Sequence, residues 1–364
     1  MIPIQNIYYM LSYAFQVLNE QGYKNIATEQ FNNTGELMAA ILEKGIAIQL
    51  KRGLGKEYIP QTEALSSLRG KIDIAESIKT QSMLRKQLIC TYDEFSVNSI
   101  MNQIIKSTVE LLLRSNISKQ RKKNLRKLMV YFSEVDFIDL YTVNWNVQYN
   151  RNNQTYRMLI SICYLVVKGL LQTQSNGHTE LMDFLDEQRM CRLYEKFILE
   201  YYRKEFKNQF TANASQIPWQ LDNEENSMLP VMQSDIMLQS GEKVLIIDAK
   251  YYGHTMQTQY DVNSIHSGNL YQIFAYVKNL DRNQTGNVAG MLLYAKTQEQ
   301  ITPNNKYSMD GNTIWVRTLD LKLPFPQIAE QLEKIAGDYF GSGKLDRTGI
   351  GTDRRCEGII EYGI

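Results

Sequence analysis

The chain has 364 residues, enough for about two domains and a substantial hydrophobic core. Apolar residues make up 43% and charged residues 22%, which excludes a largely disordered or fibrous protein. The net charge is only +1, so any contact with nucleic acid must depend on a local patch or on a partner. Four cysteines without a CxxC pair and three histidines argue against a zinc site or a disulfide framework and favour a cytoplasmic protein.

The segment before Glu20 carries no charge but lacks the basic start and the small-residue cleavage site of an export signal. Its apolar residues recur at helical spacing, which predicts a docked amphipathic helix. These residues are Ile4, Ile7, Tyr8, Leu11, Phe15 and Leu18. The apolar run over 159–171 is too short to span a bilayer and contains Lys168, so we expect a buried helix there and no membrane segment.

The first half predicts mixed α+β structure. We expect a helix over 35–49, short strand-like pieces punctuated by glycine over 49–74, and a helix over 99–113. The polar stretch 172–180 predicts a loop between domains. The expected organisation is an N-terminal domain (1–175), a second domain (181–340) and a flexible Gly-rich tail (341–364).

Seven basic residues and no acidic one lie between Arg114 and Lys127. Leu125 and Leu128 indicate that this stretch forms an amphipathic helix. Its basic side could be a solvated face, or it could contact phosphate groups.

The second half predicts an α/β domain in which a helix over 191–206 precedes the strands. The expected strands are 216–221, 229–239, 244–252 and 288–296, and the expected further helices are 264–279 and 326–339. This order contains a hairpin where a doubly wound fold would have a crossover, and we expect a mixed sheet flanked by helices.

Asp248 and Lys250 lie in the segment VLIIDAK, which we interpret as a buried strand. Because side chains alternate along a strand, both project from the same face of the sheet. A four-residue hairpin loop over 240–243 would place Asp235 directly opposite Asp248, with Cβ atoms about 5 Å apart.

Two carboxylates at that separation repel each other unless a cation lies between them. We therefore interpret Asp235 and Asp248 as candidate ligands of Mg²⁺, which binds one or two protein carboxylates and completes its octahedron with water and phosphate. Lys250 would position the attacking water or stabilise the charge that builds at phosphorus. The alternative is a buried strand that simply ends in charged residues.

Gln272 and Tyr276 are four residues apart in NLYQIFAYV and thus share one face of the predicted helix. They could support the site near Asp248 and Lys250, or they could be polar groups satisfied within the core. Glu195, on the preceding helix, is either a third carboxylate of the site or a solvated charge.

These residues carry a resemblance to known nucleases. Asp235, then Asp248-Ala249-Lys250, then the pair Gln272 and Tyr276 resemble the PD-(D/E)xK nuclease core and the helix motif of its RecB-like branch. More narrowly, IPIQNIYYMLSYAF, LRGKIDI, CTYDEFSVNSIMNQIIKST and MLPVMQSDI before LIIDAKYY are similar to the McrC family, the nuclease subunits of McrBC modified-cytosine restriction systems. The resemblance runs from about residue 2 to 340.

The resemblance implies that Asp235 and Asp248 bind Mg²⁺, that Lys250 is catalytic, and that Gln272 and Tyr276 support the site. It also implies a partner, a McrB-like AAA+ hexamer that hydrolyses GTP and reads modified cytosine in double-stranded DNA. The N-terminal domain would bind this partner and stimulate its GTPase. Ser234 stands where the nuclease motif usually has proline, a departure that affects backbone shape and no ligand.

Three functions follow as expectations. The first is an Mg²⁺-dependent endonuclease subunit of a GTP-dependent, modified-cytosine-specific restriction complex that acts in defence against phage. The second is a catalytically silent adaptor that activates the partner NTPase, and the third is a stand-alone PD-(D/E)xK nuclease. The intact Asp235, Asp248 and Lys250 argue against the second.

Overall fold

The computed structural model describes residues 2–15, 18, 23, 26, 29, 31–150, 153, 155–174, 187–222, 228–251, 256–259, 262–296 and 303–341. The predicted tail lies beyond Gly341 and so outside the described residues, as does most of the predicted interdomain loop. The chain forms two compact units. We call residues 19–185 the helical unit, and Met1–Leu18 together with Asp186–Ile364 the sheet unit.

The first helix, α1 (Ile4–Ala14), belongs to the sheet unit, which differs from the predicted N-terminal domain of residues 1–175. Its apolar stripe packs against α7 (Glu187–Glu205). Asn6 donates hydrogen bonds to the backbone oxygens of Leu321 and Leu323 at 2.8 and 2.9 Å. These partners lie more than 300 positions away in the sequence, so helical periodicity alone gives no sign of them.

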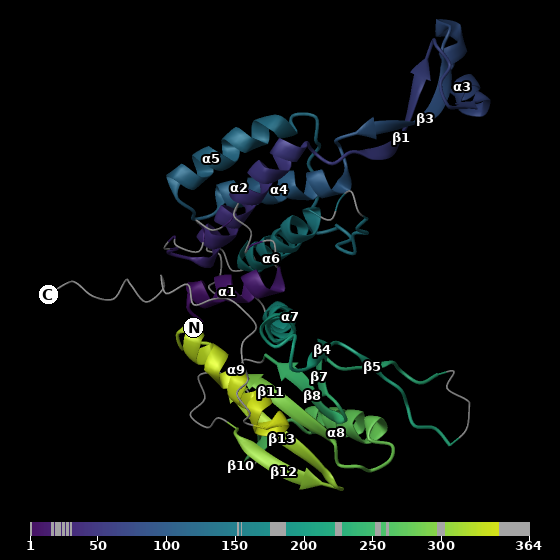
Figure 1. Ribbon diagram of the computed structural model, residues 1–364. Helices are drawn as coiled ribbons and strands as arrows, with labels where there is room; N and C mark the ends of the chain where they lie inside the picture. Colours follow the sequence, from purple (N-terminus) through teal and green to yellow (C-terminus); the bar gives the residue numbers. More distant parts are fainter. Residues whose placement is uncertain are drawn as a thin grey trace, which may run out of the picture. The chain divides into compact units, whose positions relative to one another are not determined.

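The helical unit contains four long helices and an arm that extends away from them (Figure 1). The helices are α2 (Thr34–Arg52), α4 (Ile100–Arg114), α5 (Lys119–Met129) and α6 (Tyr156–Gln174). Asn33 and Ser99 cap α2 and α4 by accepting a hydrogen bond from a backbone N–H in the first turn. The helices predicted over 35–49, 99–113 and the apolar run 159–171 are thus present as α2, α4 and α6.

The arm consists of residues 57–96. It comprises the strands β1 (Glu57–Leu65), β2 (Lys71–Asp73) and β3 (Leu88–Ser96), the helix α3 (Ile74–Lys79) and the short 3₁₀ helix η3 (Ser82–Arg85). The strands are antiparallel in the order β1-β3-β2. The sequence predicts strand-like pieces for the first part of this region but not β3, which closes the sheet.

The sheet unit is built on a six-stranded mixed sheet in the order β12-β13-β11-β8-β7-β4. The strands are β4 (Thr211–Asn213), β7 (Ile236–Ser240), β8 (Lys243–Lys250), β11 (Val288–Ala295), β12 (Asn305–Met309) and β13 (Asn312–Leu319). The central strands β8, β11 and β13 are parallel, and the outer pairings are antiparallel. Short pairs β5 (Gln216–Ile217) with β6 (Met232–Gln233), and β9 (Met256–Gln259) with β10 (Val262–Ile265), lie outside this sheet.

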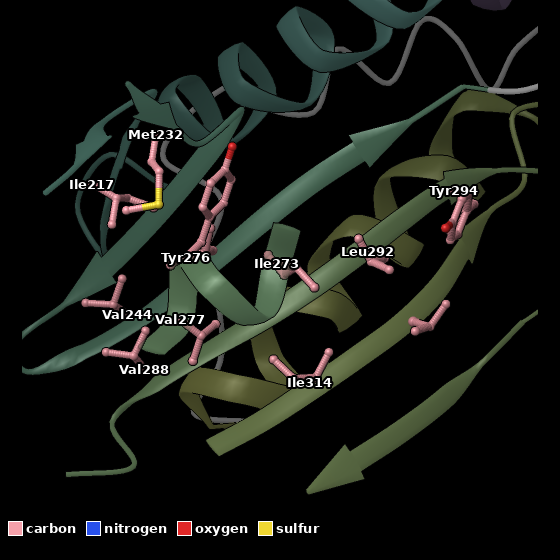
Figure 2. Close-up of a cluster of buried hydrophobic side chains, with 12 residues drawn as sticks. Ile217, Met232, Val244, Ile273, Tyr276, Val277, Val288, Leu292, Tyr294 and Ile314 are labelled. Carbon is pink, nitrogen blue, oxygen red and sulfur yellow. The ribbon is translucent and has the colours of Figure 1, made fainter. Parts of the chain in front are cut away.

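Helices cover both faces of this sheet, as the sequence predicts for an α/β domain. The helix α8 (Ser267–Leu280) packs on one face, where Ile273 and Val277 meet the strand residues Leu292 and Ile314 (Figure 2). The helix α9 (Phe325–Phe340) covers the other face. There Arg317 of β13 forms an ion pair with Asp338 at 2.6 Å, and Trp315 meets Tyr339 edge to face.

The hairpin between β7 and β8 has the predicted register, with Gln239 opposite Val244. The ladder continues one step further to Ser240 and Lys243, so the turn has two residues, Gly241 and Glu242, and not the predicted four. Gly241 has a φ of 57°, which suits the left-handed conformation that such tight turns require.

Candidate functional site

The candidate site lies at the end of β8, on the sheet face that α8 covers. The ladder of β7 and β8 ends at the pair of Ile236 and Ile247, and the next position along it sets Asp235 opposite Asp248. Asp235 accepts a hydrogen bond from the backbone N–H of Ala249 at 2.9 Å, which holds its carboxylate against β8. The predicted juxtaposition of the two aspartates is therefore present in the structure.

Asp248 is a buried carboxylate, with only 1% of its surface exposed. Burial and the negative charge of Asp235 together raise its pKa to about 7, against the opposing effect of the Lys250 ammonium group. Its Oδ1 forms an ion pair with Lys250 Nζ at 2.9 Å. Its Oδ2 is buried without a hydrogen-bond partner among the described residues. A buried oxygen without a hydrogen-bond donor destabilises the folded state, and it marks a position that an ion or water can occupy.

The other predicted residues continue from Lys250 into α8. The Nζ of Lys250 donates a hydrogen bond to Gln272 Oε1 at 3.5 Å, and Gln272 Nε2 donates to the Tyr276 hydroxyl at 2.8 Å. The Tyr276 ring lies in the hydrophobic cluster between α8 and the sheet (Figure 2). The structure therefore brings together all five residues that the sequence singles out, and the amide of Gln272 links the lysine to the tyrosine.

Glu195 lies close to this group, although the sequence leaves open whether it is a solvated charge. Its pKa is raised, first by burial and then by the negative charge of Asp235, while Lys250 lowers it. The Sγ of Cys191, one helical turn earlier on α7, donates to Glu195 Oε1 at 3.0 Å. Burial and this contact raise the pKa of Cys191 to about 12, so its thiol stays protonated. Glu195 is thus half-buried and electrostatically coupled to the site.

Sequence reasoning missed one polar pair beside Lys250. Tyr294 of β11 is the ladder partner of Lys250 and is fully buried. Its hydroxyl accepts a hydrogen bond from Asn269 Nδ2 at 3.0 Å. Asn269 lies three residues before Gln272 on α8, and that helical spacing is the signal by which it could have been found.

The residues fit a hard divalent cation. Asp235 and Asp248 offer oxygen atoms, and the unpartnered Oδ2 of Asp248 leaves one of these atoms without a competing donor. Among the described residues, no group of three or more His, Cys, Asp and Glu side chains is arranged to hold a metal ion. Asp235 and Asp248 would hold such a cation, and Mg²⁺, which combines one or two protein carboxylates with water and phosphate oxygens, fits this donor set.

The arrangement suits the hydrolysis of a phosphodiester more than covalent catalysis. With a cation held by the two carboxylates, that cation and the ammonium group of Lys250 would together present positive charge to a phosphate. The described cysteines, Cys90, Cys163 and Cys191, are all free thiols, and Cys191 is held protonated, so it is a poor nucleophile.

In the described part of the chain, no helix is both long and apolar enough to cross a membrane.

The chain is similar to known proteins. A family model described as "McrBC 5-methylcytosine restriction system component" matches residues 5–295. The chain is 29% identical over 344 residues to the type IV methyl-directed restriction enzyme EcoKMcrBC of Escherichia coli strain K12, covering 93% of this chain and 98% of that protein.

Two solved structures from Thermococcus gammatolerans are also similar. One is a half-complex from a tetradecameric assembly of McrB AAA+ hexamers with bound McrC, with a TM-score of 0.47, 18% identity, and coverage of 92% of this chain and 76% of that chain. The other is a McrBC complex, with a TM-score of 0.40, 23% identity, and coverage of 54% and 57%.

Proposed function

Because the chain belongs to the family of McrBC 5-methylcytosine restriction system components, we propose that it is the Mg²⁺-dependent endonuclease subunit of such a system. The observation that carries this proposal is the buried Asp248, which has an unpartnered oxygen, faces Asp235 and pairs with Lys250. A structural ion pair would need only one carboxylate for one lysine. A second carboxylate and a free acceptor indicate a site for a ligand.

In the proposed reaction, Asp235 and Asp248 hold the cation and Lys250 acts on the substrate. The bound Mg²⁺ would supply positive charge to the scissile phosphate and lower the pKa of water near it. Lys250 would orient the attacking water or stabilise the negative charge that develops on the phosphate oxygens. Gln272 is a positioning residue, because its amide oxygen accepts from Lys250 while Tyr276 fixes the other end of the amide.

We further propose that the substrate is double-stranded DNA carrying modified cytosine and that a GTP-hydrolysing, McrB-like AAA+ hexamer selects it. Membership in a family of restriction system components supports a partner subunit. The arm also supports a partner subunit, because its tip exposes large apolar side chains, and exposed apolar patches typically bind another protein. These are Leu68, Ile74, Ile78, Met83 and Leu84, of which Leu84 is 82% exposed. We propose that this surface, close to the glycine-rich segment Leu50 to Lys71, binds the partner and stimulates its GTPase.

The test combines the chain with its McrB-like partner, Mg²⁺ and GTP on cytosine-methylated DNA and follows DNA cuts and phosphate release. We expect Asp248→Ala and Lys250→Ala each to lower the cleavage rate at least a hundredfold, on the order of the loss of one stabilising group at a transition state. Both variants should still stimulate GTP hydrolysis. Asp222→Ala and Lys207→Ala, at exposed positions of the same unit, are the matched controls.

Three other outcomes would change the proposal. Cleavage retained by either site variant would refute the assignment of the site. Stimulated GTP hydrolysis without any cleavage by the wild-type chain would favour the silent adaptor. Cleavage of unmodified DNA without a partner would favour a stand-alone nuclease.

A further inference from the structure

The helix α5 of the helical unit has two faces of opposite character. Arg121 lies on the inner face, where its guanidinium group contacts Glu29 and Glu43 at 2.8 Å each and Glu36 at 3.4 Å. Only 16% of the Arg121 side chain is exposed, and its positive charge is paired with three carboxylates. Arg121 is therefore a structural residue, although it belongs to the basic run that the sequence shows.

Further contacts fix the rotation of α5 about its own axis. Asn124 Nδ2 donates to Glu43 Oε1 at 2.9 Å, and Leu125 is fully buried. At the start of the helix, Ser118 caps the first turn and donates through its own N–H and hydroxyl to Glu36 at 2.8 Å. These contacts clamp α5 onto α2, beside α4 (Figure 1). The opposite side of α5 must therefore face away from the packed helices.

That outer face carries only basic side chains and one glutamine. Its cations are Lys119, Lys122, Lys123, Arg126 and Lys127, and all but the half-buried Lys122 are exposed. At 3.6 residues per turn, these five fall within an arc of about 140°. None of them forms an ion pair with an acidic side chain in the part of the chain that the structure describes, in contrast to Arg121. The outer face is thus a stripe of uncompensated positive charge.

We propose that the outer face of α5 binds the phosphate backbone of double-stranded DNA without regard to base sequence. The stripe from Lys119 to Lys127 is about 12 Å long at 1.5 Å per residue. B-DNA presents one negative charge per about 1.7 Å of its axis, so the stripe reaches several phosphates. The proposal rests on the proposed function only in taking DNA as the substrate, and it assigns the helical unit a second task besides partner binding.

The chemistry of this face favours DNA over an acidic protein. Protein interfaces have an apolar or aromatic centre and few lysines, whereas four of the five cations here are lysines and no apolar side chain lies among them. Phosphate contacts need only point charges on flexible stems, which lysine provides. The positive end of the helix dipole at Lys119 adds to the attraction. Because the whole chain has a net charge of only +1, this local stripe would dominate nonspecific contact with DNA.

The test compares Lys119→Gln/Lys123→Gln/Arg126→Gln with the wild type in binding an unmodified DNA duplex. Binding is measured for the full chain, alone and with the McrB-like partner, in EDTA and over a range of salt concentrations. The control is Lys207→Gln/Lys322→Gln/Lys334→Gln, which removes the same charge from exposed positions of the sheet unit. Each variant lies outside the proposed nuclease site.

We expect the α5 variant to lower the slope of log affinity against log salt by about 2 to 3, since each phosphate contact contributes about 0.9. The control should keep the wild-type slope. An unchanged slope for the α5 variant, or no salt-dependent binding by the wild type in either setting, overturns the proposal. Loss of affinity for the partner with unchanged DNA binding overturns it in favour of a protein contact. Cleavage by the wild type tests the proposed function separately, because the binding assay contains no metal ion.

Discussion

Burial favours the protonated form of the Asp248 carboxyl group, whereas the positive charge of Lys250 favours the ionised form. The carboxylate is buried next to another carboxylate, and a single lysine compensates the pair. Such an arrangement costs stability in the absence of a ligand, because the folded state must either desolvate a charge or hold a proton. The free energy that this arrangement costs is best explained by the binding of a ligand between Asp235, Asp248 and Lys250.

The raised pKa of Asp248 predicts a particular dependence of stability on pH. The folded state holds this proton up to about pH 7, whereas the unfolded chain releases it near pH 3.8. The contribution of this group to stability is therefore fully present below pH 3.8 and is lost as the pH rises from there through 7. We expect Asp248→Asn, which mimics the protonated acid, to remove this loss, so that the variant gains on the wild type by about 1.4 kcal/mol per pH unit across that window.

Denaturant unfolding in EDTA at pH 5, 6, 7 and 8 measures this effect. Asp222→Asn, at an exposed position, serves as the control and should follow the wild type. If Asp248→Asn lost stability with rising pH as the wild type does, the group with the raised pKa would not be Asp248.

At the scale of elements, the close packing of α8 on the sheet positions Gln272. Gly290 of β11 permits it, because an added Cβ would lie 2.7 Å from Ile273 Cγ1 and 2.9 Å from Val277 Cγ2. We expect Gly290→Ala to destabilise the protein by about 1–3 kcal/mol through overpacking. It should also lower cleavage, because α8 must move away from Lys250.

Gly268→Ala on α8 itself is the matched control. Nothing lies within 4 Å of its added Cβ, and alanine favours a helix, so we expect equal or slightly higher stability and unchanged cleavage. Thermal unfolding and a cleavage assay distinguish the two variants. Equal stability of Gly290→Ala and the wild type would show that the contact between α8 and β11 can accommodate an added methyl group.

Local patterns explain which elements the sequence predicts. The alternation in VLIIDAK and the short turn before it suffice to place Asp235 opposite Asp248, and the spacing of Gln272 and Tyr276 suffices to put them on one face. The strand β13 was missed, although it lies next to β11 near the middle of the sheet. Four of its eight residues are polar, and two of these have distant partners: Asn312 Nδ2 donates to Asp281 Oδ2 at 2.6 Å, and Arg317 pairs with Asp338.

Distant packing partners also explain what the sequence did not show about the site. Glu195 lies beside an apolar stripe in the sequence and looks like a surface charge. Only the packing of α7 over β7 and β8 brings it near Asp235 and Lys250. Spacing could predict pairs within one helix or one hairpin. The approach of Gln272 to Lys250 followed from the family resemblance, and that of Glu195 was left open.

At the scale of the whole molecule, the units do not coincide with halves of the chain. The sheet unit includes α1, whose Tyr13 donates to Glu205 Oε1 at 2.9 Å and stacks near Phe325. A fragment cut at residue 175 would therefore carry a helix that lacks its packing partners.

We expect a fragment of residues 19–174 to fold and to raise the GTPase rate of the partner. A fragment of residues 1–175 should aggregate more readily, because the apolar stripe of α1 is left exposed. GTP hydrolysis and the sedimentation of both fragments measure this difference. Stimulation that required residues 186–341 would assign partner activation to the sheet unit instead.

The discontinuous sheet unit also constrains how the protein can be made. On the ribosome, α1 emerges long before its partners Leu321, Leu323 and Phe325, which are synthesised about 310 residues later. At 5–20 residues per second, this delay is roughly 15 to 60 seconds. The helical unit can fold during that time, whereas the sheet unit must wait until α9 has been synthesised. A polypeptide that ended before Leu321 would thus lack the completed sheet unit, and with it the packing that buries Asp248.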